Sequence, residues 1–349
     1  MRTVVSGVGC PRADAPTYPP RVRTTVLAGG IGGARFLRGV RAALPPTSGD
    51  TITVIGNTAD DITLFGLRVC PDLDSVMYTL GGGADEERGW GRADETFTVK
   101  EELAAYGVEP TWFGLGDRDI ATHVVRTQML DAGYPLSQVT EALCARWDLG
   151  VRLLPMSDDR VETHVVIADP DAPRERRAVH FQEYWVRLHA KPDALQVVPV
   201  GADAAAPAPG VLEALAEADV VLLAPSNPVV SIGTILAVPG IADAVRAASA
   251  PVVGLSPIVG GAPVRGMADR VLAAIAVAPD AGAVARHYGA RSAGGLLDGW
   301  LVDTVDAAAV AQVGAAGIAC RAVPLLMRDV DATAEMARAA LSLAADLRR

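Results

Sequence analysis

The sequence lacks the features that mark membrane and secreted proteins. It has no uninterrupted apolar stretch of about 18 residues, which is the length a helix needs to cross a bilayer. The first residues also lack the long apolar region of a secretory signal. We therefore expect a cytoplasmic protein without a membrane span. Residues 1–22, which contain several prolines, are predicted to form a flexible extension.

Cysteines are few and widely separated. The chain has 4 of them, at positions 10, 70, 144 and 320, and no two form a CxxC pair. This spacing excludes a CxxC-based structural zinc site and gives no sign of a disulfide framework. The thiols are expected to be free in a reducing compartment.

The chain has fewer basic than acidic residues. The chain has 31 Lys and Arg residues against 41 Asp and Glu residues, which gives a net charge of -10 and a pI of about 5.0. This balance argues against a nucleic-acid partner, because a surface that binds nucleic acid needs clustered cations. It leaves room for one bound nucleotide, since a few backbone amides and cations are enough to hold its phosphates.

What the chain has is a large apolar fraction in an α/β pattern. Of its 349 residues, 50% are hydrophobic, and short apolar strands alternate with amphipathic helices. We predict a Rossmann-like α/β fold with a mostly parallel sheet flanked by helices and a smaller inserted region. The predicted parts are a nucleotide- and phosphate-binding core with a metal site over 23–168, an insertion over 169–210 that serves as a lid or dimer contact, and the remainder of the core over 211–349.

The first predicted strand, residues 24–28, runs into a glycine-rich turn and then into apolar residues at helical spacing. This arrangement often binds phosphate, because the glycines admit the ligand and the helix N-terminus presents free amides. The alternative is a tight turn that only packs the helix on the strand, since GGxGG is neither GxGxxG nor the lysine-containing P-loop. The predicted phosphate-binding residues are Gly29, Gly30, Gly32, Gly33 and Arg35.

Carboxylates follow the second predicted strand, residues 51–55. Asp60 lies beyond the carboxyl end of this strand, where parallel sheets bind ligands, and Asp74 lies near the start of the next predicted helix. Two hard carboxylate ligands on one rim suit Mg²⁺, so Asp60 and Asp74 are the predicted metal ligands. The alternative is that Asp72 caps the helix and the other acids are solvated.

Two later loops and one aromatic residue are further candidates. Ser226 and Asn227 follow one buried strand and Ser256 follows another, so each loop is predicted to hold a ligand. Trp90 is predicted either to stack on a planar ring or to cover an edge of the core. A further strand end is predicted at residues 111–113.

Five blocks of sequence resemble, in order, those of the 2-phospho-L-lactate transferase family. The blocks are Leu27–Leu37, Cys70–Asp74, Leu115–His123, Pro225–Gly233 and Ser256–Ile258. Five ordered blocks are far more specific than a glycine turn alone, and the similarity extends from about residue 24 to the end of the chain. The alanine-rich composition and the run Trp112–Leu115 resemble the actinobacterial branch, the phosphoenolpyruvate transferases of coenzyme F-420 biosynthesis.

This resemblance implies a reaction. In the family, a guanosine diphosphate-linked enolpyruvate or lactate donates its phospho-acid to the terminal ribityl hydroxyl of the deazaflavin Fo. The products are GMP and dehydro-coenzyme F-420-0 or coenzyme F-420-0. Mg²⁺ is required, and the enzyme is a homodimer. The sequence does not decide between the two acids, because they differ by only two hydrogens.

The resemblance also assigns roles to residues. It implies that Asp60 and Asp74 bind the metal and are catalytic, that Asp74 lies near Fo, and that one of the two deprotonates the attacking hydroxyl. The amides of the glycine turn are expected to contact the transferred phosphate. The Ser226–Asn227 and Ser256 loops are expected to hold guanosine or phosphate, and Trp90 to stack on the deazaflavin.

The chain departs from the family at Gly114, and two other classes of protein are possible alternatives. Many relatives carry a basic residue where this chain has Gly114, so any contact of that side chain with Fo is absent or replaced here. An NAD-dependent oxidoreductase is disfavoured, because the glycine spacing differs and Asn57 stands where the ribose-binding acid belongs. A non-catalytic carrier of deazaflavin or nucleotide would not need carboxylates around a phosphate loop.

Overall fold

The computed structural model describes residues 21–45, 49–169 and 175–348. The predicted extension at residues 1–22 therefore lies outside the described residues, apart from its last two positions. Within the described part of the chain, no helix is long and apolar enough to cross a membrane.

A seven-stranded sheet forms the centre of the molecule. Its strands run parallel to one another in the order β14-β13-β10-β9-β1-β2-β5, which confirms the predicted α/β fold with a parallel sheet. The strands are β1 (Arg23–Ala28), β2 (Thr51–Gly56), β5 (Arg152–Pro155), β9 (Val220–Leu223), β10 (Val252–Leu255), β13 (Gly299–Val302) and β14 (Ala319–Ala322).

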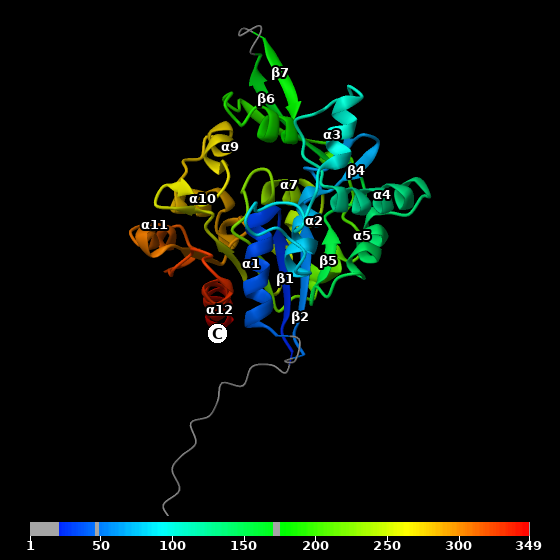
Figure 1. Ribbon diagram of the computed structural model, residues 1–349. Coiled ribbons are helices and arrows are strands. Elements are labelled where there is room, and N and C mark those ends of the chain that lie inside the picture. The colour runs from blue at the N-terminus through cyan, green and yellow to red at the C-terminus, as the bar shows by residue number, and fades with distance from the viewer. Residues whose placement is uncertain (1–20, 46–48, 170–174, 349) are drawn as a thin grey trace, which may run out of the picture.

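The order of the strands fixes where a ligand can bind. The chain starts at β1, adds β2 and β5 on one side, and then places β9, β10, β13 and β14 on the other. The direction reverses between β1 and β9, and open α/β sheets bind ligands in the crevice outside the carboxyl ends of such strands. In Figure 1 this edge of the sheet faces the upper part of the molecule.

Helices cover both faces of the sheet. The helices of the described chain are α1 (Gly30–Ala43), α2 (Pro71–Leu80), α3 (Thr98–Ala105), α4 (Asp117–Asp131), α5 (Leu136–Cys144), α6 (Val211–Ala216), α7 (Ile232–Ala237), α8 (Ile241–Ala247), α9 (Ala268–Ala274), α10 (Ala281–Tyr288), α11 (Ala309–Ala315) and α12 (Val330–Leu347). Of these, α3 and α4 lie to one side of the sheet and pack on each other (Figure 1). Val26 and Ala28 of β1 join the apolar cluster that contains residues of α1, α2, α5 and α12, whereas Leu27 joins the cluster of α6, α7, α8, α10 and α11. This alternation follows the two-residue period of a strand.

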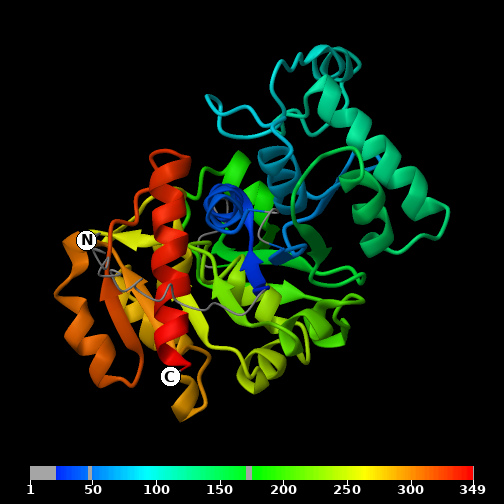
Figure 2. The same cartoon turned by 90° about the horizontal axis from the view of Figure 1, so that it is seen from below.

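Helices α1 and α12 pack closely on one face (Figure 2). Gly39 makes this approach possible, because a Cβ at this position would lie 2.4 Å from backbone atoms of Thr333. The packing of α12 on α1 stabilises the position of α1, whose N-terminus lies at the carboxyl edge of the sheet.

A small antiparallel sheet stands over that edge (Figure 1). Its order is β7-β6-β8, with β6 (Glu162–Ala168), β7 (Arg176–His180) and β8 (Gln196–Val200). Residues 162–168 fall inside the core region predicted over 23–168, but β6 pairs with β7 and β8 instead of the large sheet. Its residues alternate between buried and half-buried, a pattern typical of an antiparallel sheet with one covered face. The division of the chain into domains stays a prediction.

Two short hairpins complete the rim: β3 (Ile62–Leu64) with β4 (Leu67–Val69), and β11 (Ile258–Val259) with β12 (Ala262–Pro263). The strand end predicted at residues 111–113 is wrong, because these residues adopt an irregular conformation. Phe113 packs instead against the apolar cluster of the β3–β4 hairpin. The apolar run therefore covers a hairpin and does not enter a sheet.

Candidate functional site

The glycine turn lies between β1 and α1, at the point where the strand order reverses. Gly30 has φ +64°, which favours glycine, and α1 starts there without a side-chain cap from Gly29. A Cβ on Gly29 would lie 2.6 Å from Oδ2 of Asp72, and one on Gly33 would lie 2.7 Å from Oγ of Ser226. The glycines are thus required for the close packing of three loops around the start of α1.

Ser226 joins the loop after β9 to this turn. Its hydroxyl accepts a hydrogen bond from the amide of Gly29 (3.1 Å) and donates one to the carbonyl of Gly29 (2.8 Å). The side chains of Asn227 and Ser256 have local roles. Asn227 Oδ1 accepts hydrogen bonds from the amides of residues 229 and 230, and Ser256 Oγ bonds to the backbone of residue 258. The structure therefore brings Ser226 to the glycine turn, whereas Asn227 and Ser256 shape their own loops.

Buried carboxylates gather beside the glycine turn. Asp60 and Asp61 follow β2, and Asp72 and Asp74 lie in the first turn of α2. Asn57 connects these segments, because its Nδ2 donates to Asp72 Oδ2 (2.9 Å). The same amide nitrogen also donates to a backbone carbonyl of the loop after β9 (3.2 Å), so Asn57 connects Asp72 to that loop.

The electrostatics of these acids set them apart from surface carboxylates. Burial raises the pKa of Asp60 well above its usual value, and the nearby charge of Asp72 raises it further. Burial also raises the pKa of Asp72 to about 7 and that of Asp61 to about 6, although the Arg68 guanidinium opposes the shift at Asp61. Within the described part of the chain, Oδ1 of Asp60, Oδ1 of Asp61 and Oδ2 of Asp74 are buried without a hydrogen-bond partner. Such orphaned acceptors indicate a place for a cation or a proton.

Asp74 has different neighbours from Asp60. Its carboxylate pairs with the fully buried guanidinium of Arg126, whose Nη1 also contacts Nδ1 of His123 at 3.0 Å. Nε2 of His123 in turn lies 3.4 Å from Oδ1 of Asp119, which accepts a hydrogen bond from the hydroxyl of Tyr78 (2.6 Å). Ligand atoms of Asp74, Asp119 and His123 lie within 4.8 Å of one another, but Arg126 already supplies positive charge to this group.

The small sheet holds the segment that carries Asp60. The side-chain amide of Gln182 donates to the carbonyl of Asp60 (3.3 Å), and Nε2 of His180 contacts the carbonyl of Asp61 (3.1 Å). The predicted insertion is thus built into the site and does not merely stand over it.

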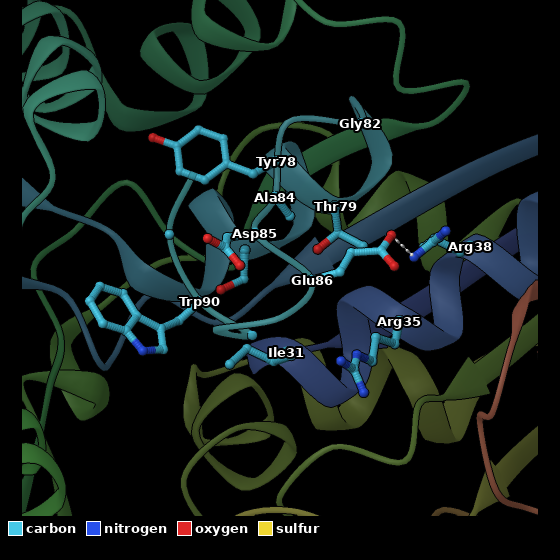
Figure 3. A pocket seen from close by; sticks show the side chains of 13 residues that line it. Ile31, Arg35, Arg38, Tyr78, Thr79, Gly82, Ala84, Asp85, Glu86 and Trp90 are labelled. Atoms are coloured by element: carbon cyan, nitrogen blue, oxygen red, sulfur yellow. Dashed lines mark hydrogen bonds and ion pairs between the residues drawn. The ribbon is translucent and has the colours of Figure 1, made fainter. Parts of the chain in front are cut away.

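A pocket lies beside the start of α1, the helix that follows the glycine turn (Figure 3). Residues of α1, α2 and the loop 82–91 line it, among them Ile31, Arg35 and Trp90. The indole of Trp90 is 43% exposed and lies under the guanidinium of Arg88, 4.7 Å from ring centre to Cζ. It also occupies space beside Gly114, where an added Cβ would lie 3.1 Å from the ring. The indole of Trp90 therefore fills the space that a side chain at position 114 would need.

Sequence reasoning missed Asp72 and Arg126. The alternative interpretation made Asp72 a helix cap, but α2 has no side-chain cap among the described residues. The Asp72 carboxylate instead accepts a hydrogen bond from Nδ2 of Asn57 and lies against the glycine turn. Arg126 lies three residues after His123, on the same face of α4, within a helix of low hydrophobicity. That spacing was the available signal, because a helix that buries an arginine and a histidine needs an acid opposite them.

Comparison with known proteins identifies the family of the chain. The family model of the 2-phospho-L-lactate transferase CofD matches residues 24–321. A phosphoenolpyruvate transferase of Streptomyces griseus is 72% identical over 327 residues, covering 94% of this chain and 100% of that protein. A protein of the same name from Thermobifida fusca is 65% identical over 332 residues, covering 94% of this chain and 99% of that protein.

Solved structures support the fold. The crystal structure of protein BH3568 from Bacillus halodurans aligns with a TM-score of 0.58 at 19% sequence identity, covering 92% of this chain and 99% of that one. At this identity the match concerns the fold alone. The chain is therefore a transferase that belongs to the 2-phospho-L-lactate transferase CofD family.

Proposed function

We propose that this enzyme transfers a phosphoenolpyruvyl or 2-phospholactyl group from a guanosine diphosphate-linked donor to the ribityl hydroxyl of Fo, a step in coenzyme F-420 biosynthesis. The observation that carries the proposal is the group of buried carboxylates packed against a glycine turn at the switch point of a doubly wound sheet. The names of relatives at 72% and 65% identity support the enolpyruvyl form of the donor.

The transfer makes one bond and breaks one. The hydroxyl oxygen of Fo forms a new bond to the phosphorus that carries the three-carbon acid, and the bond from this phosphorus to the bridging oxygen breaks. GMP leaves with that electron pair, and the hydroxyl proton passes to a carboxylate. Asp60 is the proposed proton acceptor, because burial and the nearby charge of Asp72 raise its pKa.

The carboxylates fit a divalent metal ion. Oδ1 of Asp60 and Oδ2 of Asp74 are buried oxygens without a partner among the described residues, and hard oxygens of this kind suit Mg²⁺. When bound, the ion would neutralise charge on the phosphate oxygens. Arg126 would orient the Asp74 carboxylate, since it engages Oδ1 and leaves Oδ2 without a hydrogen-bond partner among the described residues.

Other residues would position the substrates. The amides at the start of α1 would contact phosphate at the carboxyl edge of the sheet. The loops of Ser226 and Ser256 would hold the nucleotide, and Trp90 would stack on the planar deazaflavin. A homodimer and the cytoplasm as its location belong to the same proposal.

The proposal is tested by mass spectrometry of a reaction that contains Fo, freshly generated donor and the purified enzyme, with Mg²⁺ or with chelator. Metal-dependent formation of GMP and dehydro-coenzyme F-420-0 is the expected result. Product from the lactyl donor alone would overturn the enolpyruvyl assignment and keep the reaction class.

Two control measurements separate the rival functions. Asp74→Asn should lose turnover and keep Fo binding if the protein is an enzyme of this kind. Binding of Fo without turnover of either donor by the unaltered protein would favour a carrier, and tight binding of NAD would favour an oxidoreductase.

A further inference from the structure

Arg265 connects two segments that are far apart in the sequence. It lies between β12 and α9, and its Nη2 donates a hydrogen bond to the carbonyl of Gly89 (3.3 Å) in the loop that lines the pocket. Gly89 has φ +76°, and a Cβ there would lie 2.3 Å from the same Nη2. The glycine thus provides both the backbone conformation and the space that bring the guanidinium onto the pocket loop.

Arg35 approaches the same place from α1. It lines the pocket together with Gly89, whose carbonyl accepts the hydrogen bond from Arg265. Partial burial lowers the pKa of Arg265, and the positive charge of Arg35 lowers it further. Figure 3 shows Arg35 one turn before Arg38 on α1, pointing away from the ion pair that Arg38 forms with Glu86. Two guanidinium groups from different parts of the chain therefore converge near the start of α1.

Neither guanidinium is neutralised by a carboxylate of the described residues. Within residues 21–45, 49–169 and 175–348, neither Arg35 nor Arg265 forms an ion pair with a carboxylate. Neighbouring arginines differ, because Arg38 pairs with Glu86 (2.6 Å) and Arg270 pairs with Asp193 (3.6 Å). In a chain with 41 acidic residues, two cations that meet one pocket loop and have no carboxylate partner among the described residues indicate a site for an anion that comes from outside.

We propose that Arg35 and Arg265 together bind the diphosphate group of the nucleotide-linked substrate, with Arg265 closing over the pocket from the β12–α9 loop. Arginine suits this task, because its planar fork donates two parallel hydrogen bonds to phosphate oxygens. The start of α1 adds its partial positive charge on the same side. The inference rests on the proposed function for the identity of the nucleotide, but the anion site is defined by the two arginines alone.

A nucleic-acid backbone or an anionic membrane would need a broader basic surface than this one. The chain carries a net charge of -10, and Arg38 beside the pair is already neutralised. A compact dianion or trianion is the ligand that two converging guanidiniums match.

The test is calorimetric titration of the full-length protein with inorganic pyrophosphate and, separately, with GDP. Arg35→Ala and Arg265→Ala are each expected to weaken binding of both probes about 10- to 100-fold, because each removes a charge-assisted pair of hydrogen bonds. Arg265→Lys should fall between the wild type and Arg265→Ala, since it keeps the charge and loses the fork. Arg270→Ala, five positions along the same segment, is the matched control and should bind both probes as the wild type does.

The outcomes separate this inference from the proposed function. Equal binding by Arg265→Ala and the wild type, or equal loss in Arg270→Ala, would overturn the two-arginine site. So would a wild-type protein that binds neither probe. If pyrophosphate and GDP bind through both arginines but no group is transferred to Fo, the anion site stands and the proposed reaction fails. An unchanged thermal melting curve for each variant excludes unfolding as the cause.

Discussion

Nη1 of Arg126 lies 3.0 Å from Nδ1 of His123, in a contact buried between α2 and α4. Because arginine only donates hydrogen bonds, Nδ1 of His123 must accept, and the ring proton is left on Nε2, which faces Asp119. The same guanidinium pairs with Asp74. Arg126 therefore fixes the histidine tautomer and the orientation of the predicted catalytic carboxylate with one group.

This geometry predicts that Arg126→Met destabilises the protein by about 3–5 kcal/mol, because Asp74 is left as a buried charge without its partner. Urea denaturation of both proteins measures the difference. Arg338→Met on α12, which removes an exposed ion pair with Glu335, should change stability by less than about 1 kcal/mol. The double variant Asp74→Asn with Arg126→Met should lose less than the sum of the single losses, and strict additivity would contradict the pairing.

The raised acid pKa values predict how stability varies with pH. The pKa of Asp61 is about 6 and that of Asp72 about 7 in the folded protein, against an ordinary value of 3.8. The folded state thus holds these protons more tightly than the unfolded state. The resulting stabilisation is complete below about pH 4 and is lost as pH rises through 6 and 7.

In chelator, the two acids should therefore make the protein less stable at pH 8 than at pH 5, and Asp72→Asn should reduce this loss by about 1–3 kcal/mol. Thermal unfolding at a series of pH values, with and without Mg²⁺, measures the effect. A bound divalent ion should restore stability at pH 8, because it favours the ionised carboxylates. A flat profile in chelator that Asp72→Asn leaves unchanged would contradict the assigned pKa values.

The glycine turn predicts a contrast between two alanine substitutions. Gly33→Ala should destabilise the protein and weaken binding of phosphate ligands, because its Cβ would lie 2.7 Å from Oγ of Ser226 and 3.0 Å from Cβ of Ala28. Gly314→Ala in α11 meets no atom within 4 Å and should be neutral or stabilising by up to about 1 kcal/mol, as usual for a helical glycine. Melting temperatures of the two variants against the wild type decide whether the turn is as closely packed as described.

The sequence was sufficient to predict the large parallel sheet. It was not sufficient to predict which residues contact each buried carboxylate. Strands such as β10 were predictable because buried parallel strands are continuous apolar runs. The location of Ser226 at the carboxyl edge of the sheet was predictable, because this residue follows a buried strand. The link between Asp72 and the glycine turn was not, because it depends on how α2 packs against α1, and local patterns do not contain that information.

The same limit explains two other misjudged segments. β6 has the composition of a core strand, and only its pairing with β7 assigns it to the small sheet. Phe113 belongs to an apolar run that looks like a strand, yet the β3–β4 hairpin needs that surface as its cover. Arg265 carried no motif at all, since its partner in the pocket loop lies 176 positions away.

The contact between Trp90 and Gly114 predicts a specific effect on deazaflavin binding. Trp90→Ala should weaken Fo binding by about tenfold and Trp90→Phe by less, if the ring stacks on the ligand. Gly114→Arg should also weaken it, because a side chain there displaces the indole, whose edge lies 3.1 Å from the position of the new Cβ. The stability of Gly114→Arg should change little, since Trp90 is 43% exposed and its indole has room to move outward.

Fluorescence titration of Fo measures all three variants, and Tyr106→Ala, which removes an aromatic ring that is 84% exposed, is the control. If Gly114→Arg binds Fo more tightly than the wild type, a basic side chain at this position contacts the ligand directly, and the indole is not its replacement.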